Sequence, residues 1–109
     1  MDQTDSKRFR AHVPVKFARE GQPGEARGFV YNLSSESCKI TSDTRVIPGT
    51  YLTLKLYLPN PHALTEIQLA VVRWTQGWDF GVTFLHMQSE EFQRLNLYLA
   101  SLETTSAAS

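Results

Sequence analysis

Leu52-Thr53-Leu54-Lys55-Leu56-Tyr57-Leu58 is the most regular stretch of the chain, because its four leucines alternate with threonine, lysine and tyrosine. Successive side chains of a β-strand point to opposite faces, so alternation of this kind is typical of a strand with one buried face. The leucines would line the core, and the other residues would face water. We therefore expect this stretch to be a half-buried strand of a β-sheet.

Strand-like patterns also occur on both sides of this segment. One of them, over residues 27–33, is expected to place Phe29, Tyr31 and Leu33 on one face. Turns rich in glycine and proline separate the segments, as in an all-β protein. The other expected strands start at Val13 and cover residues 38–41, 67–74 and 78–84.

A single helix is expected after the last strand. Ser89 is a suitable N-cap, and Glu90 and Glu91 follow where the helix dipole favours acidic side chains. The apolar residues that come next are spaced as on one face of a helix. They are Phe92, Leu95, Leu99 and Leu102.

The strands must hide their edges, and closing into a small barrel does so most economically. An open sheet with the helix on one face is the alternative, but many short strands with brief turns favour the barrel. We expect an all-β fold, a six-stranded antiparallel barrel with a C-terminal α-helix. Its parts would be a basic N-terminal arm over residues 1–12, the barrel and helix over 13–102, and a polar tail over 103–109.

The composition is that of an ordinary globular protein of one domain, with 109 residues and a formal net charge of zero. Zero net charge argues against attraction of the whole surface to nucleic acid or anionic lipid. The single cysteine excludes an internal disulfide and favours a reducing compartment. No apolar run is long enough for membrane insertion, and residues 1–6 lack the apolar part of a secretory signal. We expect a cytoplasmic protein.

The residue types that carry catalysis or bind metals are scattered. His12, His62 and His86 are far apart in the sequence, and none has a carboxylate or thiol at metal-ligand spacing. Cys38 lies in an expected strand, where a cysteine usually packs as a small apolar residue. Ser34 lacks the Gly-x-Ser-x-Gly pattern of a hydrolase. We therefore expect neither an enzyme nor a metal or other cofactor.

Two polar segments are candidates for ligand binding. Lys7, Arg8 and Arg10 form a basic arm, which is either solvated or able to bind phosphate, because a guanidinium pairs with phosphate through two hydrogen bonds and stacks on a base. Asn32-Leu33-Ser34-Ser35-Glu36-Ser37 is a polar stretch between two strands. Its side chains either stabilise a turn or present amide and hydroxyl groups to a base or a phosphate.

The order of these features resembles the PilZ domain, a family of bacterial cyclic di-GMP receptors. The resemblance spans the chain from Arg8 to about Leu99 and implies a six-stranded barrel with a C-terminal helix. The stretches that carry it, besides the arm, are Val13-Pro14-Val15, Asn32-Leu33-Ser34, Pro48-Gly49, Val72-Arg73-Trp74 and Gly81-Val82-Thr83-Phe84.

The family motifs are Arg-x-x-x-Arg in the arm and Asp/Asn-x-Ser-x-x-Gly after the second strand. This chain departs from each motif at one position. His12 stands at the second arginine, and a histidine is cationic only part of the time near neutral pH. Ser37 stands at the glycine, where its Cβ is costly if the backbone needs a positive φ. The ligand set that the resemblance implies is Arg8, Arg10, His12, Asn32, Ser34 and Ser37, with Arg10 able to supply the missing guanidinium.

The function that follows is a cyclic di-GMP receptor and adaptor that signals to an unidentified protein partner. An alternative is a PilZ-like adaptor that has lost the nucleotide and acts only by binding protein. A third possibility is a barrel that binds single-stranded nucleic acid through the arm and exposed aromatic side chains such as Trp74 and Trp78. Zero net charge and the lack of a long basic stripe argue against this third possibility.

Overall fold

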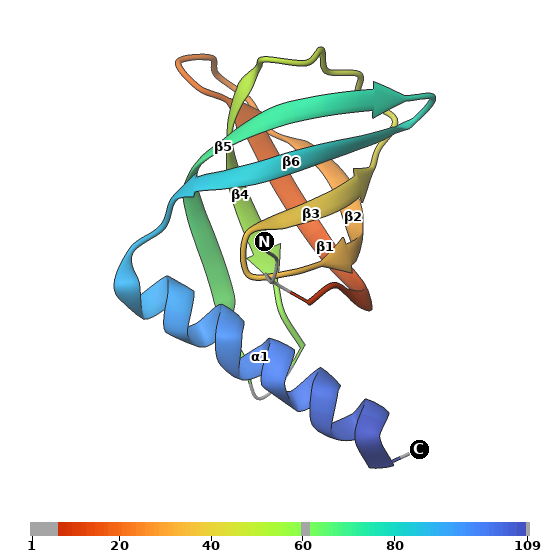
Figure 1. The fold of residues 1–109 in the computed structure, drawn as a ribbon. Helices are drawn as coiled ribbons and strands as arrows, with labels where there is room; N and C mark the ends of the chain where they lie inside the picture. Colours follow the sequence, from red (N-terminus) through yellow and green to blue (C-terminus); the bar gives the residue numbers. More distant parts are fainter. Residues whose placement is uncertain (1–6, 60–61, 109) are drawn as a thin grey trace, which may run out of the picture.

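Six antiparallel strands form a closed barrel, and one helix follows them (Figure 1). The computed structural model describes residues 7–59 and 62–108, with side chains up to Glu103. Around the barrel the strands follow the order β1-β2-β3-β6-β5-β4. The expected fold class is therefore confirmed. The elements are β1 (Phe9–Arg19), β2 (Ala26–Leu33), β3 (Ser37–Thr41), β4 (Tyr51–Tyr57), β5 (Leu64–Gln76), β6 (Asp79–His86) and α1 (Ser89–Ala108).

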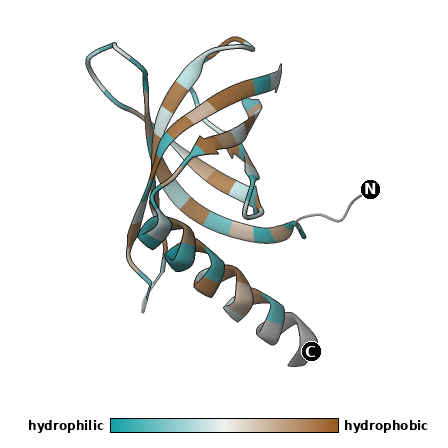
Figure 2. Ribbon diagram, turned by 60° about the vertical axis from the view of Figure 1, so that its left-hand side comes forward, coloured by the Kyte–Doolittle hydropathy of each residue, from teal (hydrophilic) through white to brown (hydrophobic). Residues whose placement is uncertain are grey.

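The barrel interior is filled by alternate side chains of every strand, which gives the banded hydropathy seen in Figure 2. The leucine stretch behaves as its pattern predicts, because Leu52, Leu54 and Leu56 are fully buried. Across the interior, the rings of Phe17 and Phe80 pack edge to face, with centroids 5.3 Å apart. This packed core makes the outer face of the barrel the surface available for binding.

Strand β2 does not bury the expected residues. Val30 and Leu33 face the core, whereas Phe29 keeps 41% of its surface exposed. The cause is a bulge: on β3, Ile40 and Lys39 are adjacent, but their partners on β2 are Val30 and Asn32. Tyr31 is the extra residue, and it reverses the alternation beyond it. The prediction that Phe29, Tyr31 and Leu33 share a face was therefore wrong.

Two expected boundaries also differ. β1 begins at Phe9, so residues 9–12 belong to the barrel and only the residues before them precede it. Phe9 pairs with Leu33, and both Phe9 and Ala11 pack partly against the core, which explains the longer strand. At the other end, α1 continues to Ala108 through residues that were expected to form a polar tail.

Helix α1 lies against one end of the barrel and extends beyond it (Figure 1). Leu95, Tyr98 and Leu99 are buried, but Phe92 is 45% exposed. Glu91 fixes the start of the helix by accepting a 2.7 Å hydrogen bond from the backbone N–H of Glu66 on β5. Within the described residues, no helix has the length and apolar character needed to span a membrane.

Candidate ligand-binding face

The turn between β2 and β3 is built around one hydroxyl group. Ser34 is 1% exposed, and its Oγ accepts hydrogen bonds of 3.1 Å from the backbone N–H groups of Glu36 and Ser37. The Ser34 N–H donates to the Ser37 carbonyl at 2.9 Å, which closes the turn. This is the local bonding that serine offers a turn. Ser34 therefore shapes the turn, and its hydroxyl does not face solvent.

Ser37 fits its position without backbone strain. It is the first residue of β3 and pairs with Thr83 on β6. Among the described residues, no residue other than glycine has a positive φ. The conformational cost expected for a serine at this glycine position is therefore absent, and what Ser37 adds to the surface is a half-buried side chain.

The basic residues of the arm lie beside this turn. Arg10 is directly opposite Asn32 in the pairing of β1 with β2. Burial has the larger effect on the pKa of the Cys38 thiol and raises it far above its usual range. Arg8 lies close enough to Cys38, near the start of β3, for its charge to lower the same pKa. His12 is exposed and stacks on Phe29, with ring centroids 4.5 Å apart and an angle of 15° between the planes. The barrel thus brings the two motifs together at one end.

One row of pairing extends this site across five strands. Asn32 is flanked by Arg10 on β1 and by Lys39 on β3. Lys39 pairs in turn with Gly81 on β6, and Gly81 pairs with Trp74 on β5. The row therefore reads cation, amide, cation, glycine and indole. Lys39 and Gly81 were not among the site residues expected from the sequence, because strand neighbours across a barrel do not follow chain order.

The far end of this row is an ordered group of aromatic and charged residues. Lys39 Nζ lies 5.1 Å from the centroid of the Tyr31 ring and 5.7 Å from that of Trp74. Burial and a hydrogen bond with Asp79 raise the pKa of Tyr31 to about 12. Trp74 keeps 40% of its surface exposed and covers Gly81, where an added Cβ would overlap the indole. A lone glycine within a strand is the sequence signal for such a close approach.

The described residues contain no group of three or more His, Cys, Asp or Glu side chains that could hold a metal ion. His62 packs edge to face against Tyr98, with ring centroids 5.4 Å apart. Cys38 is a free and buried thiol. The chemistry that the candidate face offers is therefore recognition of anions and planar rings, by cations, an amide and aromatic side chains.

Comparisons with known proteins agree with this fold. No curated protein sequence matches the chain. Among solved structures, MotI/DgrA, the inhibitor of motility from Bacillus subtilis, is 19% identical with a TM-score of 0.76. That match covers 96% of this chain and 53% of the other, so this chain spans about half the length of MotI/DgrA.

Two further structures are PilZ domains. The PilZ domain of YcgR from Escherichia coli, solved with cyclic di-GMP, is 12% identical with a TM-score of 0.74, covering 96% of this chain and 95% of that one. The PilZ domain of CeSA from a cellulose-synthesizing bacterium is 15% identical with a TM-score of 0.67, covering 90% and 99%. The family model for the PilZ domain matches residues 2–101. The chain belongs to the PilZ domain family.

Proposed function

We propose that this chain binds cyclic di-GMP on the outer face where β1, β2 and β3 meet, and that the bound form signals to a protein partner. PilZ domains are receptor and adaptor domains rather than enzymes, and the YcgR structure contains cyclic di-GMP. The residues proposed to form the site are Arg8, Arg10, His12, Asn32, Ser34 and Ser37, together with Lys39 and Trp74.

The observation that carries this proposal is the row from Arg10 through Asn32 and Lys39 to Trp74. Cyclic di-GMP has two phosphates and two guanine bases. The cations on either side of Asn32 supply charge for a phosphate, and the amide can bond a guanine edge. Trp74 offers a ring face for a guanine, and Gly81 lets that ring lie against the barrel.

The residues of the family motifs take different parts in this proposal. Arg8 lies before β1, where its guanidinium is free to contact a phosphate and stack on guanine. Ser34 acts through the shape of the turn, because its hydroxyl is already bonded to that turn. His12 is exposed, and its ring already stacks on that of Phe29.

The position of His12 also supports a second candidate function, an adaptor that binds protein without the nucleotide. In this chain the second motif arginine is replaced by an imidazole that already has a ring partner, Phe29. Without that arginine the site has one permanent charge fewer than the family motif provides. A direct binding measurement separates the two functions.

The decisive experiment is calorimetric titration of the chain with cyclic di-GMP, comparing Arg8→Ala with the wild type. Removing a charge-assisted hydrogen bond should cost about 1.5–3 kcal/mol, which weakens binding by at least about tenfold. Arg19→Ala is the matched control, because Arg19 is an exposed arginine at the opposite end of β1. Equal affinity of all three proteins would remove Arg8 from the site.

A second titration tests the two departures from the family motifs. Ser37→Gly combined with His12→Arg should tighten binding by at least about tenfold, since arginine adds a permanent charge and two parallel donors. If neither the wild type nor the double variant binds, the nucleotide proposal fails and the protein-only adaptor is the function. If the wild type binds at submicromolar levels and the double variant does not improve on it, the departures do not limit affinity.

A further inference from the structure

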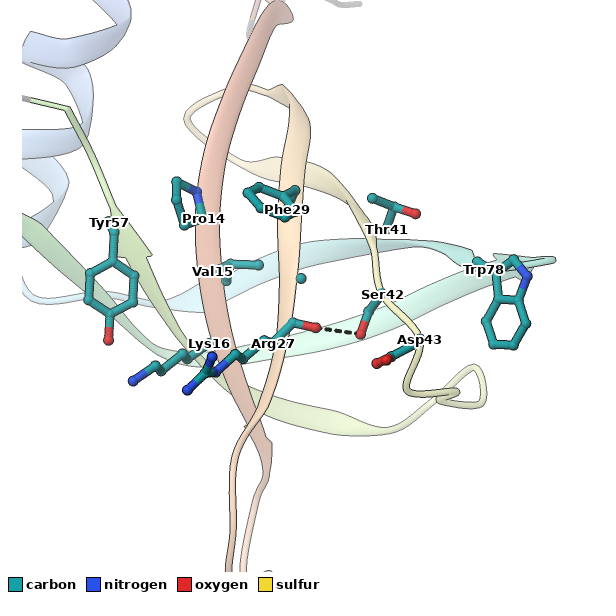
Figure 3. Close-up of a pocket in the computed structure, with 11 residues that line it drawn as sticks. Pro14, Val15, Lys16, Arg27, Phe29, Thr41, Ser42, Asp43, Tyr57 and Trp78 are labelled. Carbon is teal, nitrogen blue, oxygen red and sulfur yellow. Dashed lines mark hydrogen bonds between the residues drawn. The ribbon is translucent and has the colours of Figure 1, made fainter.

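A hollow lies on the outer face of the barrel, next to the candidate ligand-binding face at Phe29. It has a volume of about 1070 Å³ and is formed by residues of β1, β2, β3 and β4 and of the segments after β3 and β5 (Figure 3). Its floor includes Gly28, where an added Cβ would lie 2.5 Å from the Thr41 carbonyl oxygen. The charged and aromatic residues that line it include Lys16, Arg27, Phe29, Asp43 and Trp78.

One side of the hollow is cationic. Lys16 pairs with Lys55 on β4 and with Arg27 on β2, so three cations stand side by side across three strands. Glu25 bonds Lys55 at 2.9 Å, and the charges of both Lys55 and Lys16 lower the pKa of this carboxyl group. Within the described residues, neither Lys16 nor Arg27 forms an ion pair. Like charges on neighbouring strands repel, so the row is suited to an anionic partner.

The other sides of the hollow carry aromatic rings that are exposed but held in place. Phe29 is 41% exposed and stacks on His12, while Trp78 is 55% exposed and lies under Arg45, with the guanidinium 4.5 Å from the ring centroid. Figure 3 shows Phe29 and Trp78 on either side of Ser42, with Lys16 and Arg27 together at one edge. Rigid aromatic side chains beside arginine are typical of the centre of a protein interface.

The size and openness of the hollow favour a segment of a protein over a small molecule. Small-molecule sites enclose about 300–1,000 Å³ and bury most of the ligand. This hollow is slightly larger than that range, and its rings remain exposed. At Lys16, β1 is paired with both β2 and β4, so no free strand edge is available there to which a peptide could add. A partner segment must therefore be recognised by its side chains.

We propose that this hollow docks an acidic segment of a partner protein that carries a large apolar side chain. The carboxylates would lie on Lys16 and Arg27, and the apolar side chain would pack between Phe29 and Trp78. Asp43, which lies beside Ser42 on the Trp78 side of the hollow (Figure 3), disfavours acidic residues there and so gives the segment a direction. This surface adjoins the nucleotide site at Phe29, on which His12 stacks, but it goes beyond that site because Lys16, Arg27 and Trp78 take no part in it.

The test uses a fluorescein-labelled peptide of sequence EDEWEDLE, with anisotropy as the readout in about 50 mM salt, where surface charges are less screened. Control peptides are QNQWQNLQ, which lacks the charges, and EDEGEDGE, which lacks the apolar side chains. Binding of the first peptide should exceed that of each control by at least about fivefold, because both features are needed. Equal binding of the three peptides, or no binding, would overturn the proposal.

Protein variants then locate the contact. Lys16→Glu and Arg27→Glu should each weaken binding by at least about fivefold, while Arg73→Glu, an exposed site outside the hollow, should change it by less than about twofold. If charge reversal prevents folding, Lys16→Gln and Arg27→Gln replace the charge-reversal variants in the same binding assay. Cyclic di-GMP titration of the Lys16 and Arg27 variants should be unchanged, so failure of the nucleotide proposal is seen separately. The peptide should change amide NMR shifts only around the hollow, and changes elsewhere would refute the inference. Displacement of the peptide by a mononucleotide would also refute it, and so would dimerisation of the chain through this face.

Discussion

Replacing Ser34 by alanine tests whether one buried hydroxyl holds the β2–β3 turn. The hydroxyl accepts the backbone N–H groups of Glu36 and Ser37, each at 3.1 Å. It is 1% exposed, so water cannot replace it freely. Each hydrogen bond contributes a net of about 0.5–1.5 kcal/mol, so losing both should lower the free energy of unfolding by about 1–3 kcal/mol.

The assay is urea unfolding, followed by tryptophan fluorescence and by circular dichroism. The midpoint of unfolding should fall while the dependence on urea stays constant, because the surface exposed on unfolding is unchanged. The melting temperature should fall by about 4 °C or more for each kcal/mol in a domain near this size. Ser35→Ala is the control, because the Ser35 hydroxyl forms no hydrogen bond with the described residues. Equal stability of the two variants would refute the structural role of Ser34.

Three other predictions concern side chains around the barrel. Gly81→Ala should displace the Trp74 indole into water, seen as a red shift of tryptophan emission, and an unshifted spectrum would contradict this contact. Absorbance at high pH should show Tyr31 ionising near pH 12, and Asp79→Asn should lower the pKa of Tyr31. Because this pKa is raised in the folded state, the free energy of unfolding should fall as pH rises from about 10 to about 12. Glu91 has a lowered pKa because it accepts a backbone hydrogen bond from β5, so its contribution should be present above pH 4.5 and lost in acid; Glu91→Gln should flatten the pH dependence of stability in that range.

The sequence predicts the fold well where alternation is unbroken. The leucines of β4 were assigned correctly because the irregularity between Leu52 and Leu54 adds its extra residue to the partner strand β5 and leaves the alternation of β4 intact. The start of β1 was expected at Val13 and lies at Phe9, although Phe9 and Ala11 continue the alternation of the buried residues that follow. The faces of β2 could not be read in the same way, because nothing in its residue types marks Tyr31 as an extra residue.

The candidate site was only partly visible in the sequence. The order of the motifs indicated that the arm and the β2–β3 turn meet, and the pairing of Arg10 with Asn32 agrees with this. Lys39 and Trp74 join them only because β3 pairs with β6, and β6 with β5. A long stretch of chain separates β3 from β6, so this pairing does not follow chain order. Whether a residue of a motif can bind a ligand also depends on its burial. For Ser34, only the geometry of the turn shows that the hydroxyl is already bonded within it.

The bulge in β2 has a consequence for changes in chain length. Val30 and Leu33 both face the core, and the two residues between them share the outer side. Deleting Tyr31 would leave a strand that alternates regularly, with Asn32 outside and Leu33 still inside. Deleting Phe29 instead would place later residues of β2 out of phase with the earlier part of the strand. Position 31 is therefore the point at which β2 itself could lose one residue while keeping Val30 and Leu33 inside and Asn32 outside. The pairing with β1, which is irregular between Arg10 and Val13, would have to adjust.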